Sequence, residues 1–440
     1  MKNVNFTNIF VMIFVFGTIF SYLINQALNL LNYISRRKNG SILPEELKKI
    51  PASSVFDEEK LKKISNYENM NYFASIPEAL IDVFLTLSLA LSGFYPWLLN
   101  RCLSIVCSGS IPQNFLQTFC SAFLFFFLAS IPSMIISIPF EIFDEFYIEK
   151  KFGFSKMTAK LWILDQIKSF VVSMILIAVL LLAMIFVMQV FPKSWWIFLL
   201  IVILAFSLLM QVLYPLVIAP LFNKFSPLEE GELKNRLENL LVKTGFKLNG
   251  VFIVDASKRS GHSNAYFGGF GKSKRIVLYD TLVEQLTPEE IEAVLGHELG
   301  HYKLKHIIKR FITLIPVMAL MMYLLFYCAT HLSIYIGFGF SFYEGAILPE
   351  SLQFVGLFLS SMVWSSLSTI ISPISNYFSR KDEFQADNFS KEITKNPDAL
   401  ISGLIKLNSE NLSELLPSKI YAAWNYSHPT LLERIKKLSE

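Results

Sequence analysis

Charged residues are scarce in this sequence. Asp, Glu, Lys and Arg make up 17% of its 440 residues, whereas soluble domains average about a quarter. Hydrophobic residues reach 53%, with 41 Phe, and the mean hydropathy is +0.47. This balance is typical of a protein in contact with lipid, so the lipid bilayer is its first expected partner. The net charge of +4 comes with no basic stripe or recognition motif, and we predict no nucleic-acid partner.

Cysteine is also rare. The four cysteines lie in or beside apolar stretches, at positions Cys102, Cys107, Cys120 and Cys328. Their spacing fits neither a zinc ribbon nor a redox pair. We interpret them as small buried hydrophobic residues.

Long apolar runs, by contrast, are abundant. A membrane helix needs about 20 mostly apolar residues, and seven stretches qualify: 7–31, 79–99, 115–140, 169–191, 195–218, 311–331 and 352–376. The first is too long for a signal peptide and has no clear cleavage site of small residues, so we predict a retained span.

The segments between the spans alternate in charge. Lys and Arg gather in residues 32–78, 141–168, 219–310 and 377–440. The opposite side carries only Lys2, Arg101 and Lys193. The positive-inside tendency then puts the C-terminus in the cytosol and the N-terminus on the other side.

We therefore predict a mainly α, polytopic membrane protein with four parts. They are five spans with cytosolic loops (1–218), a soluble insert (219–310), two further spans (311–376) and a cytosolic tail (377–440).

The insert ends in an HExxH motif, from His297 to His301. Residues four apart share one face of a helix, so both imidazoles can reach one metal ion. Glu298 lies about 100° round the helix, where it can touch a metal-bound water as general base. The preceding Thr287-Pro288-Glu289-Glu290 predicts a helix start with a capping box.

A catalytic zinc site takes three protein ligands and leaves a position for water, so a third ligand is needed. His306 lies five residues beyond His301, off the ligand face, and we interpret it as a helix-surface residue that can be substituted with little effect. His331 falls at the far end of the sixth span, whereas His262 and His428 stay open as candidates.

Glu383 is a better choice because it directly follows the seventh span. Asp387 lies four residues further on, so one carboxylate could bind the metal while the other orients a ligand histidine. Spacing alone leaves Asp382 as a rival ligand. With any of these sets, the natural reaction is peptide hydrolysis, in which Glu298 takes a proton from water and delivers it to the leaving amine.

The motifs together resemble the type I CaaX prenyl proteases, integral-membrane zinc metalloproteases. The resemblance is carried by HELGH at 297–301 and EFQAD at 383–387, and by APLFNKF, HSNAYF, IVLYDTL and SHPTLLERI at 219–225, 262–267, 276–282 and 427–435. It covers nearly the whole chain. One departure is Tyr302, where the family often has Trp.

The resemblance implies one Zn²⁺ per chain, bound by His297, His301 and Glu383, with Glu298 as the catalytic base. It implies that Asp387 orients a ligand histidine without binding the metal itself. It also implies that Asn264, His428 and Arg434 bind the substrate backbone or stabilise the tetrahedral intermediate, with Asn264 and His428 counted as catalytic.

The same resemblance implies that seven helices enclose an intramembrane chamber, with a zincin-like HExxH domain on the cytosolic side. Residues near 264–282 would form an edge strand for an extended peptide. The implied substrates are prenylated CaaX proteins or peptides. The implied location is the endoplasmic reticulum membrane, with the inner nuclear membrane as a further possibility.

A serine stripe in the seventh span bears on the chamber. Ser361, Ser365, Ser368, Ser372 and Ser375 fall on one helical face. Such a stripe fits a hydrated cavity and close helix packing equally well.

Two other functions stay open. One is a membrane quality-control metalloprotease that clears misfolded or stalled polypeptides. The other is a non-catalytic scaffold, which the retained Glu298 and the lack of an obvious fourth ligand disfavour.

Overall fold

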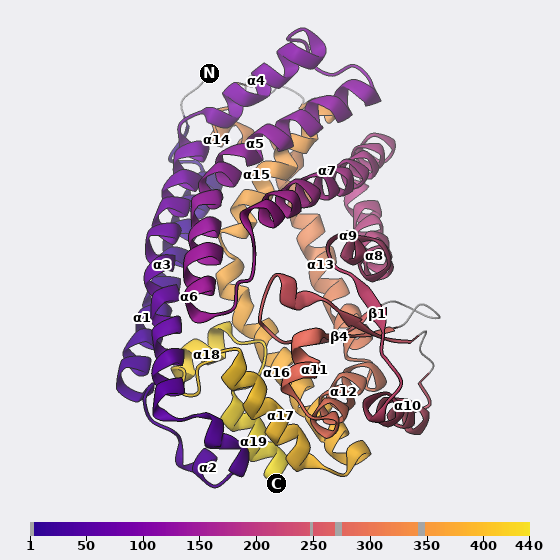
Figure 1. Ribbon diagram of the computed structural model, residues 1–440. Coiled ribbons are helices and arrows are strands. Elements are labelled where there is room, and N and C mark those ends of the chain that lie inside the picture. The colour runs from indigo at the N-terminus through magenta and orange to yellow at the C-terminus, as the bar shows by residue number, and fades with distance from the viewer. Residues whose placement is uncertain (1–3, 247–249, 269–274, 342–347) are drawn as a thin grey trace.

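The computed structural model describes residues 4–246, 250–268, 275–341 and 348–440. Helices dominate it, and Figure 1 shows their arrangement. The helices of the first half are α1 (Ile9–Asn39), α2 (Glu45–Lys48), α3 (Glu58–Leu91), α4 (Phe94–Cys107), α5 (Phe115–Phe143), α6 (Lys150–Phe152), α7 (Ala159–Val190), α8 (Trp195–Leu213) and α9 (Ala219–Phe222). Those of the second half are α10 (Glu232–Thr244), α11 (Asp280–Gln285), α12 (Pro288–Lys303), α13 (His306–Thr330), α14 (Leu332–Gly337), α15 (Gln353–Ser365), α16 (Ser368–Thr394), α17 (Pro397–Glu410), α18 (Lys419–Asn425) and α19 (Leu431–Ser439).

Short turns and strands complete the described chain. Two π-helical turns, η2 (Asp144–Glu149) and η3 (Tyr214–Ile218), extend α5 and α8. The 3₁₀ turns are η1 (Pro51–Val55), η4 (Ala256–Lys258) and η6 (Glu350–Leu352), and the strands are β1 (Phe225–Pro227), β2 (Val251–Val254), β3 (Ala265–Gly268) and β4 (Arg275–Tyr279).

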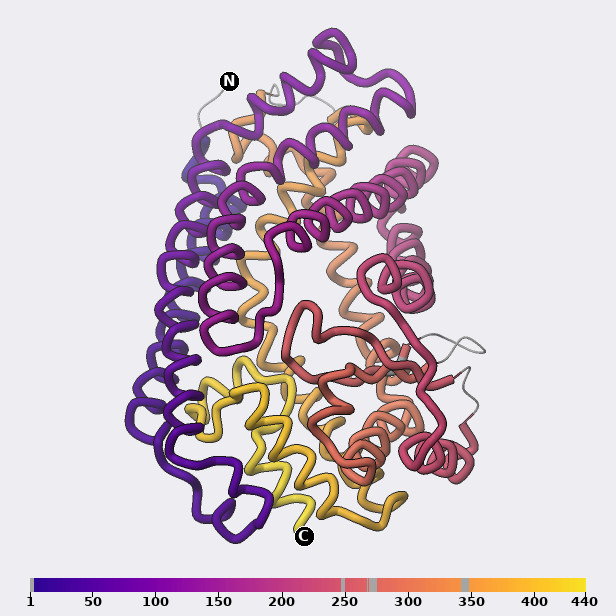
Figure 2. Tube along the Cα trace, viewed as in Figure 1, coloured from indigo at the N-terminus to yellow at the C-terminus, as the bar shows by residue number. Residues whose placement is uncertain are grey.

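Among the described residues, six continuous helices have the length and composition of membrane spans. The pair α15 and α16, bent by 66°, makes a seventh if it is counted as one span. This confirms a multi-pass membrane protein, and it agrees with seven spans when the bent pair is counted. The two ends of the chain lie at opposite ends of the molecule (Figure 2).

The bounds of two predicted spans were wrong. The second span was expected at 79–99, but α3 begins at Glu58 and ends at Leu91, and Gly93 with φ 80° then starts a new helix. The seventh was expected at 352–376, but α15 ends at Ser365 and α16 begins at Ser368 and runs on to Thr394. Hydropathy shows where apolar stretches lie in the sequence. It does not show the backbone dihedral angles at which a helix ends.

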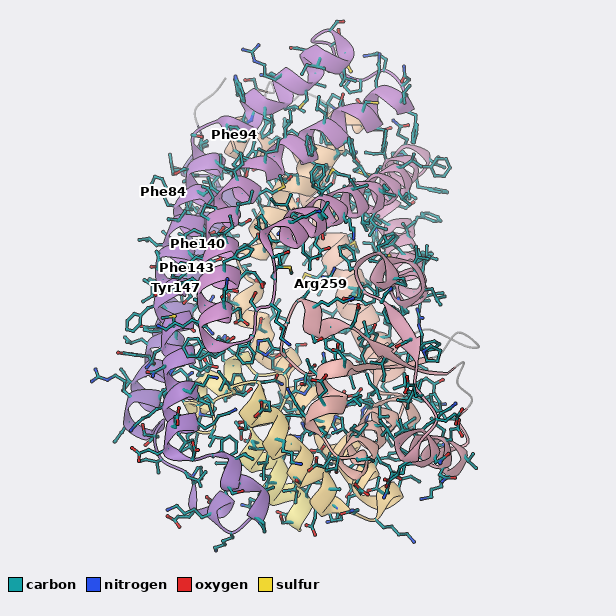
Figure 3. The ribbon with its side chains drawn as sticks, viewed as in Figure 1. Phe84, Phe94, Phe140, Phe143, Tyr147 and Arg259 are labelled. Atoms are coloured by element: carbon teal, nitrogen blue, oxygen red, sulfur yellow. The ribbon has the colours of Figure 1, made fainter. Side chains whose placement is uncertain are left out.

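Exposed apolar side chains cover the outside of the bundle. Figure 3 shows Phe84 of α3 and Phe143 of α5 on the flank of the molecule, and they are 72% and 44% exposed. Large exposed apolar surfaces of this kind belong in lipid rather than in water.

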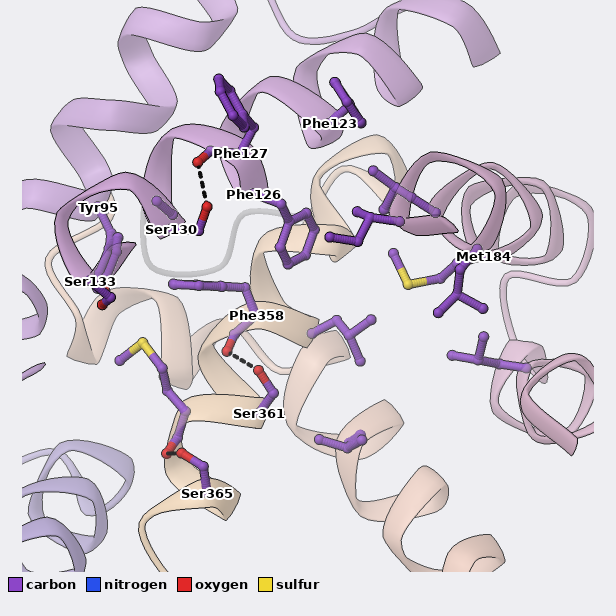
Figure 4. Close-up of a pocket in the computed structure, with 18 of the residues that line it drawn as sticks. Tyr95, Phe123, Phe126, Phe127, Ser130, Ser133, Met184, Phe358, Ser361 and Ser365 are labelled. Atoms are coloured by element: carbon purple, nitrogen blue, oxygen red, sulfur yellow. Dashed lines mark hydrogen bonds between the residues drawn. The ribbon is translucent and has the colours of Figure 1, made fainter. Parts of the chain in front are cut away.

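A partly open cavity lies among the membrane helices. A cavity of about 730 Å³ lies between α3, α4, α5, α7, α8, α13 and α15, with Phe126, Phe358 and Met184 among its walls (Figure 4). Ser361 and Ser365 of the predicted stripe line it, each donating a hydrogen bond to a carbonyl of its own helix. The other three serines of the stripe lie beyond the bend, on α16.

The insert folds around a small sheet with the order β1-β2-β4-β3. β2 and β4 are parallel, whereas β3 pairs antiparallel with β4 and has no partner strand on its other side among the described residues. The prediction of an edge strand near 264–282 is therefore confirmed only for β3, because β4 in the same range is paired on both sides. Residues 269–274 of the predicted range lie outside the described residues.

Candidate metal centre

Helix α12 begins as its sequence predicts. The Thr287 side chain accepts a hydrogen bond from the amide of Glu290, and the Glu290 carboxylate accepts one from the amide of Thr287 at 2.8 Å. Glu290 is buried, and it also accepts hydrogen bonds from Ser402 at 2.6 Å and Lys406 at 2.8 Å. The start of the HExxH helix is thus fixed to α17.

Two glycines let α12 approach α16 closely. A Cβ on Gly300 would lie 2.9 Å from Ala386 Cα, and one on Gly296 would lie 2.8 Å from Ser390 Oγ. Ser390 also donates to the Ala293 carbonyl at 2.6 Å. Because any side chain would hold the helices apart, this approach places both histidines of α12 against the acidic residues of α16.

The three predicted ligands converge at this contact. His297 Nε2 and His301 Nε2 are 3.1 Å apart. Glu383 Oε2 lies 3.3 Å from His297 Nε2, and Glu383 Oε1 lies 3.1 Å from His301 Nε2. Ligand atoms bound tetrahedrally at about 2.0–2.1 Å lie about 3.3 Å from one another, so the set fits one ion.

The hydrogen bonding of Glu383 also fits a metal. Its buried Oε2 has no hydrogen-bond partner among the described residues, although His428 Nδ1 lies 2.8 Å away. The orientation of the imidazole and the carboxylate does not allow His428 to donate to Oε2 despite this short distance. A buried carboxylate oxygen without a donor is costly unless a cation satisfies it.

The pKa of His297 also bears on metal binding. Burial lowers the pKa of this imidazole, but the carboxylates of Asp387 and Glu383 outweigh burial and raise its pKa to about 9. A metal ligand must be the neutral imidazole, so metal binding here displaces a proton and weakens as the pH falls.

Asp387 orients the first ligand. Its Oδ1 accepts from His297 Nδ1 at 2.7 Å, which leaves Nε2 for a metal. Arg434 then binds Asp387 through two hydrogen bonds, of 2.9 and 2.6 Å, and is 12% exposed. The geometry therefore places Arg434 behind Asp387, whereas the sequence predicted contact with substrate.

Glu298 faces an open pocket beside the ligands. This pocket has a volume of about 510 Å³, and its lining includes Glu298, His301, Glu383, His428 and Tyr266 of β3. The expected base, two ligands and the edge strand thus border one space that a peptide can enter.

The other predicted substrate residues differ in position. His428 lines the pocket and is 66% exposed at its side chain. Asn264 directly precedes β3, but its side chain is exposed and accepts from the amide of Ala265 at 2.8 Å. The structure thus brings His428 to the cluster and leaves Asn264 at the start of the edge strand.

The interpretation of His306 as a surface residue was wrong. Its side chain is 3% exposed, and its Nδ1 lies 3.1 Å from His301 Nδ1. The sequence argument extended the phase of α12 through His306, but Lys305 has φ 58° and α13 starts afresh at His306. A non-glycine residue in this left-handed conformation gives little signal in a sequence.

Two ring nitrogens and a carboxylate on packed helices, in a chain with several candidate membrane spans, fit a membrane metallopeptidase. Residues 32–224 match the family described as CAAX prenyl protease N-terminal, five membrane helices, and residues 227–440 match Peptidase family M48. The chain therefore belongs to the CAAX prenyl protease group of peptidase family M48, as its motifs predicted, and this family implies a metal cofactor.

Individual relatives agree along the chain. CAAX prenyl protease 1 of Saccharomyces cerevisiae is 32% identical over 92% of this chain and 91% of its own length. The CAAX prenyl protease 1 homolog of Oryza sativa subsp. japonica is 40% identical over 70% of this chain and 71% of its own. The crystal structure of S. mikatae Ste24p superposes with a TM-score of 0.85 at 31% identity, over 98% of this chain and 99% of that one.

Proposed function

We propose that this protein is a zinc metalloendopeptidase that removes the last three residues of prenylated CaaX proteins. The observation that carries the proposal is the convergence of His297, His301 and Glu383 beside Glu298 in one open pocket. The names of the relatives, CAAX prenyl protease 1, supply the substrate class.

Zinc is the metal that this donor set suits. Two imidazoles and one carboxylate are the ligands of several zinc peptidases, and three protein ligands leave one position open. When bound, zinc would polarise the scissile carbonyl and make water a stronger acid.

Glu298 is the proton carrier in this proposal. It takes the proton of the attacking water and passes it to the leaving amine, which moves one proton per peptide bond cut. Asp387 and Arg434 hold His297 in one orientation.

The substrate is held by the strand and the pocket. An extended peptide adds to the free edge of β3, where main-chain hydrogen bonds bind it. Asn264 stands at the start of that edge. His428, with its ring in the pocket, is a suitable donor to the developing oxyanion. Arg434 already binds Asp387 through its Nε and Nη2, so we assign it the supporting role first.

We assign the protein to the endoplasmic reticulum membrane, with the inner nuclear membrane as a second location, and we place its C-terminus in the cytosol. The distribution of Lys and Arg supports this orientation.

Cleavage of a farnesylated CaaX peptide by the detergent-purified protein tests the proposal. We expect release of the three terminal residues, abolished by a zinc chelator and restored by zinc. Glu298→Ala should bind zinc with unchanged stoichiometry and lose activity by about 10²–10⁴-fold, the usual contribution of a general base.

Controls separate the alternatives. The same peptide without its farnesyl group tests whether the protein recognises the lipid. Cleavage of unprenylated, misfolded membrane proteins alone would support the quality-control function, and full cellular activity of Glu298→Gln would support the scaffold.

A further inference from the structure

His306 contacts the predicted ligand His301 and is not a predicted ligand itself. It belongs to the lining of the pocket beside the cluster, although its side chain is only 3% exposed. Its ring is buried, with its plane 76° from that of His301 and the ring centroids 5.2 Å apart. The turn at Lys305, with φ 58°, brings it back onto the end of α12.

A metal at His301 Nε2 would determine where the protons of His301 and His306 lie. His301 points its Nε2 at the ligand cluster and its Nδ1 at His306 Nδ1, 3.1 Å away. Two ring nitrogens at this distance need one donor and one acceptor. If Nε2 of His301 offers its lone pair to a metal, its proton is on Nδ1, so His301 donates and His306 accepts.

The far side of His306 supports the same tautomer. His306 Nε2 then carries the proton, and it lies 3.3 Å from Gln385 Oε1, an acceptor on α16. The Asp382 carboxylate is 4.0 Å from the same nitrogen and pairs instead with Arg310 at 3.0 Å. Both hydrogen bonds, from His301 to His306 and from His306 to Gln385, can therefore form when His306 is neutral.

We propose that His306 is a positioning residue for the metal ligand His301, which it holds in the Nδ1-protonated tautomer by accepting its hydrogen bond. This inference rests on the metal site of the proposed function, not on the substrate. It gives the two histidine ligands unlike supports, because His297 donates to the charged carboxylate of Asp387. A neutral acceptor donates less charge through the ligand than a carboxylate does, and this keeps the metal a stronger Lewis acid.

Amide substitutions of different length test the proposal. In His306→Asn the amide oxygen can occupy the place of Nδ1 and still accept from His301. In His306→Gln the amide reaches the place of Nε2 and leaves the Nδ1 position empty. Zinc affinity of the full-length protein in detergent, measured by competition with a chelator, should fall about 10–100-fold in His306→Gln and His306→Ala, the usual effect of losing such a partner. His306→Asn should retain most of the affinity.

Cobalt supplies a second readout that needs no substrate. The visible absorption of the Co²⁺-substituted protein should shift in His306→Gln and stay near the parent in His306→Asn. Equal zinc affinity in His306→Ala and the parent, or equal losses in the Asn and Gln variants, would overturn the proposal. If His306→Ala does not fold, the Asn and Gln pair still decides. His331→Ala is the matched control, because His331 contacts Tyr327 at the other end of α13, and its affinity should not change.

These readouts also distinguish two failures. A parent protein that binds zinc but does not cut prenylated peptide contradicts the proposed substrate and leaves the role of His306 intact. Loss of cleavage in His306→Ala with unchanged zinc affinity contradicts the positioning role alone.

Discussion

At the scale of single residues, the site depends on partners that satisfy every polar atom except those facing the metal. His297 has Asp387 behind it, and Asp387 has Arg434. Among the three predicted ligands and Asp387, Glu383 is the residue that keeps a buried oxygen without a hydrogen bond. This arrangement fits a cation held between His297, His301 and Glu383.

Glu383→Ala tests the ligand assignment directly. We expect the variant to lose both zinc and peptidase activity, since two histidines alone bind zinc weakly. Zinc content of the purified protein, measured beside activity, checks this. Asp382→Ala is the matched control: its carboxylate is a neighbour on the same helix that pairs with Arg310, and the variant should keep its zinc. Normal zinc content in Glu383→Ala would refute the assignment.

Residue chemistry was only partly predictable from the sequence. The HExxH spacing identified His297, His301 and Glu298, because helix periodicity alone places them. Spacing left Asp382 open beside Glu383, and the family motif was needed to choose. The prediction for His306 was wrong because the position of His306 depends on one backbone angle at Lys305. The identity of a residue does not predict such an angle.

At the scale of elements, the site is the contact between α12 and α16. Gly296 and Gly300 face Ser390 and Ala386 there, with almost no space for a side chain. The seventh span bends at Ser366–Leu367, and α16 runs on to Thr394, so Glu383 and Asp387 belong to the same helix as the end of the span. Motion of this membrane helix would therefore move a metal ligand.

Gly300→Ala tests the close approach. Its new Cβ would lie 2.9 Å from Ala386 Cα and 3.1 Å from the Ala386 carbonyl, both backbone atoms that cannot turn aside. We expect α12 to shift, the unfolding free energy to fall by about 1–3 kcal/mol, and the zinc affinity to fall with it. Thermal unfolding in detergent and chelator competition measure the two effects.

Gly403→Ala is the matched control for that substitution. Gly403 of α17 also faces α12, but its Cβ would lie 3.5 Å from Glu290 Cβ, an ordinary contact. The higher helix propensity of alanine, worth about 1 kcal/mol, should leave this variant as stable as the parent or more so. Equal behaviour of the two variants would mean that α12 and α16 are not held at a critical distance.

Elements were easier to predict where local chemistry decides them. The capping box at Thr287 and Glu290 predicted the start of α12, and the long apolar runs predicted the membrane spans. The end of α3 and the bend before α16 were not predicted, because apolar residues continue through both. A helix stops there through a positive φ at Gly93 or through tertiary packing, neither of which hydropathy reports.

At the scale of the whole molecule, His262 joins three separate parts. Its Nε2 lies 3.2 Å from Glu149 of η2, at the end of a membrane span, and its Nδ1 lies 3.2 Å from Asn411, which follows α17. The ring also stacks on Phe154 at 3.9 Å between centroids. Arg259 makes a second such link, to Asp165 of α7, at 2.7 Å (Figure 3). These contacts hold the insert between the spans and the C-terminal helices. His262 lies two residues before Asn264.

This junction should make stability depend on pH. Burial lowers the pKa of His262, but the hydrogen bond to Glu149 outweighs burial and holds the pKa above its usual value of about 6.5. A group with a raised pKa in the folded state stabilises that state fully below its unfolded pKa, and the contribution is lost as the pH rises through the folded value.

His262→Gln keeps an amide in place of the ring but cannot take a charge. The thermal unfolding temperature of the parent should therefore exceed that of His262→Gln most below about pH 6.5, and the difference should shrink as the pH rises above it. Comparing the two proteins at each pH cancels the titration of the metal site, which both share. A difference that is constant across this range would show that His262 acts by packing on Phe154, and that its charge does not hold the insert to the membrane helices.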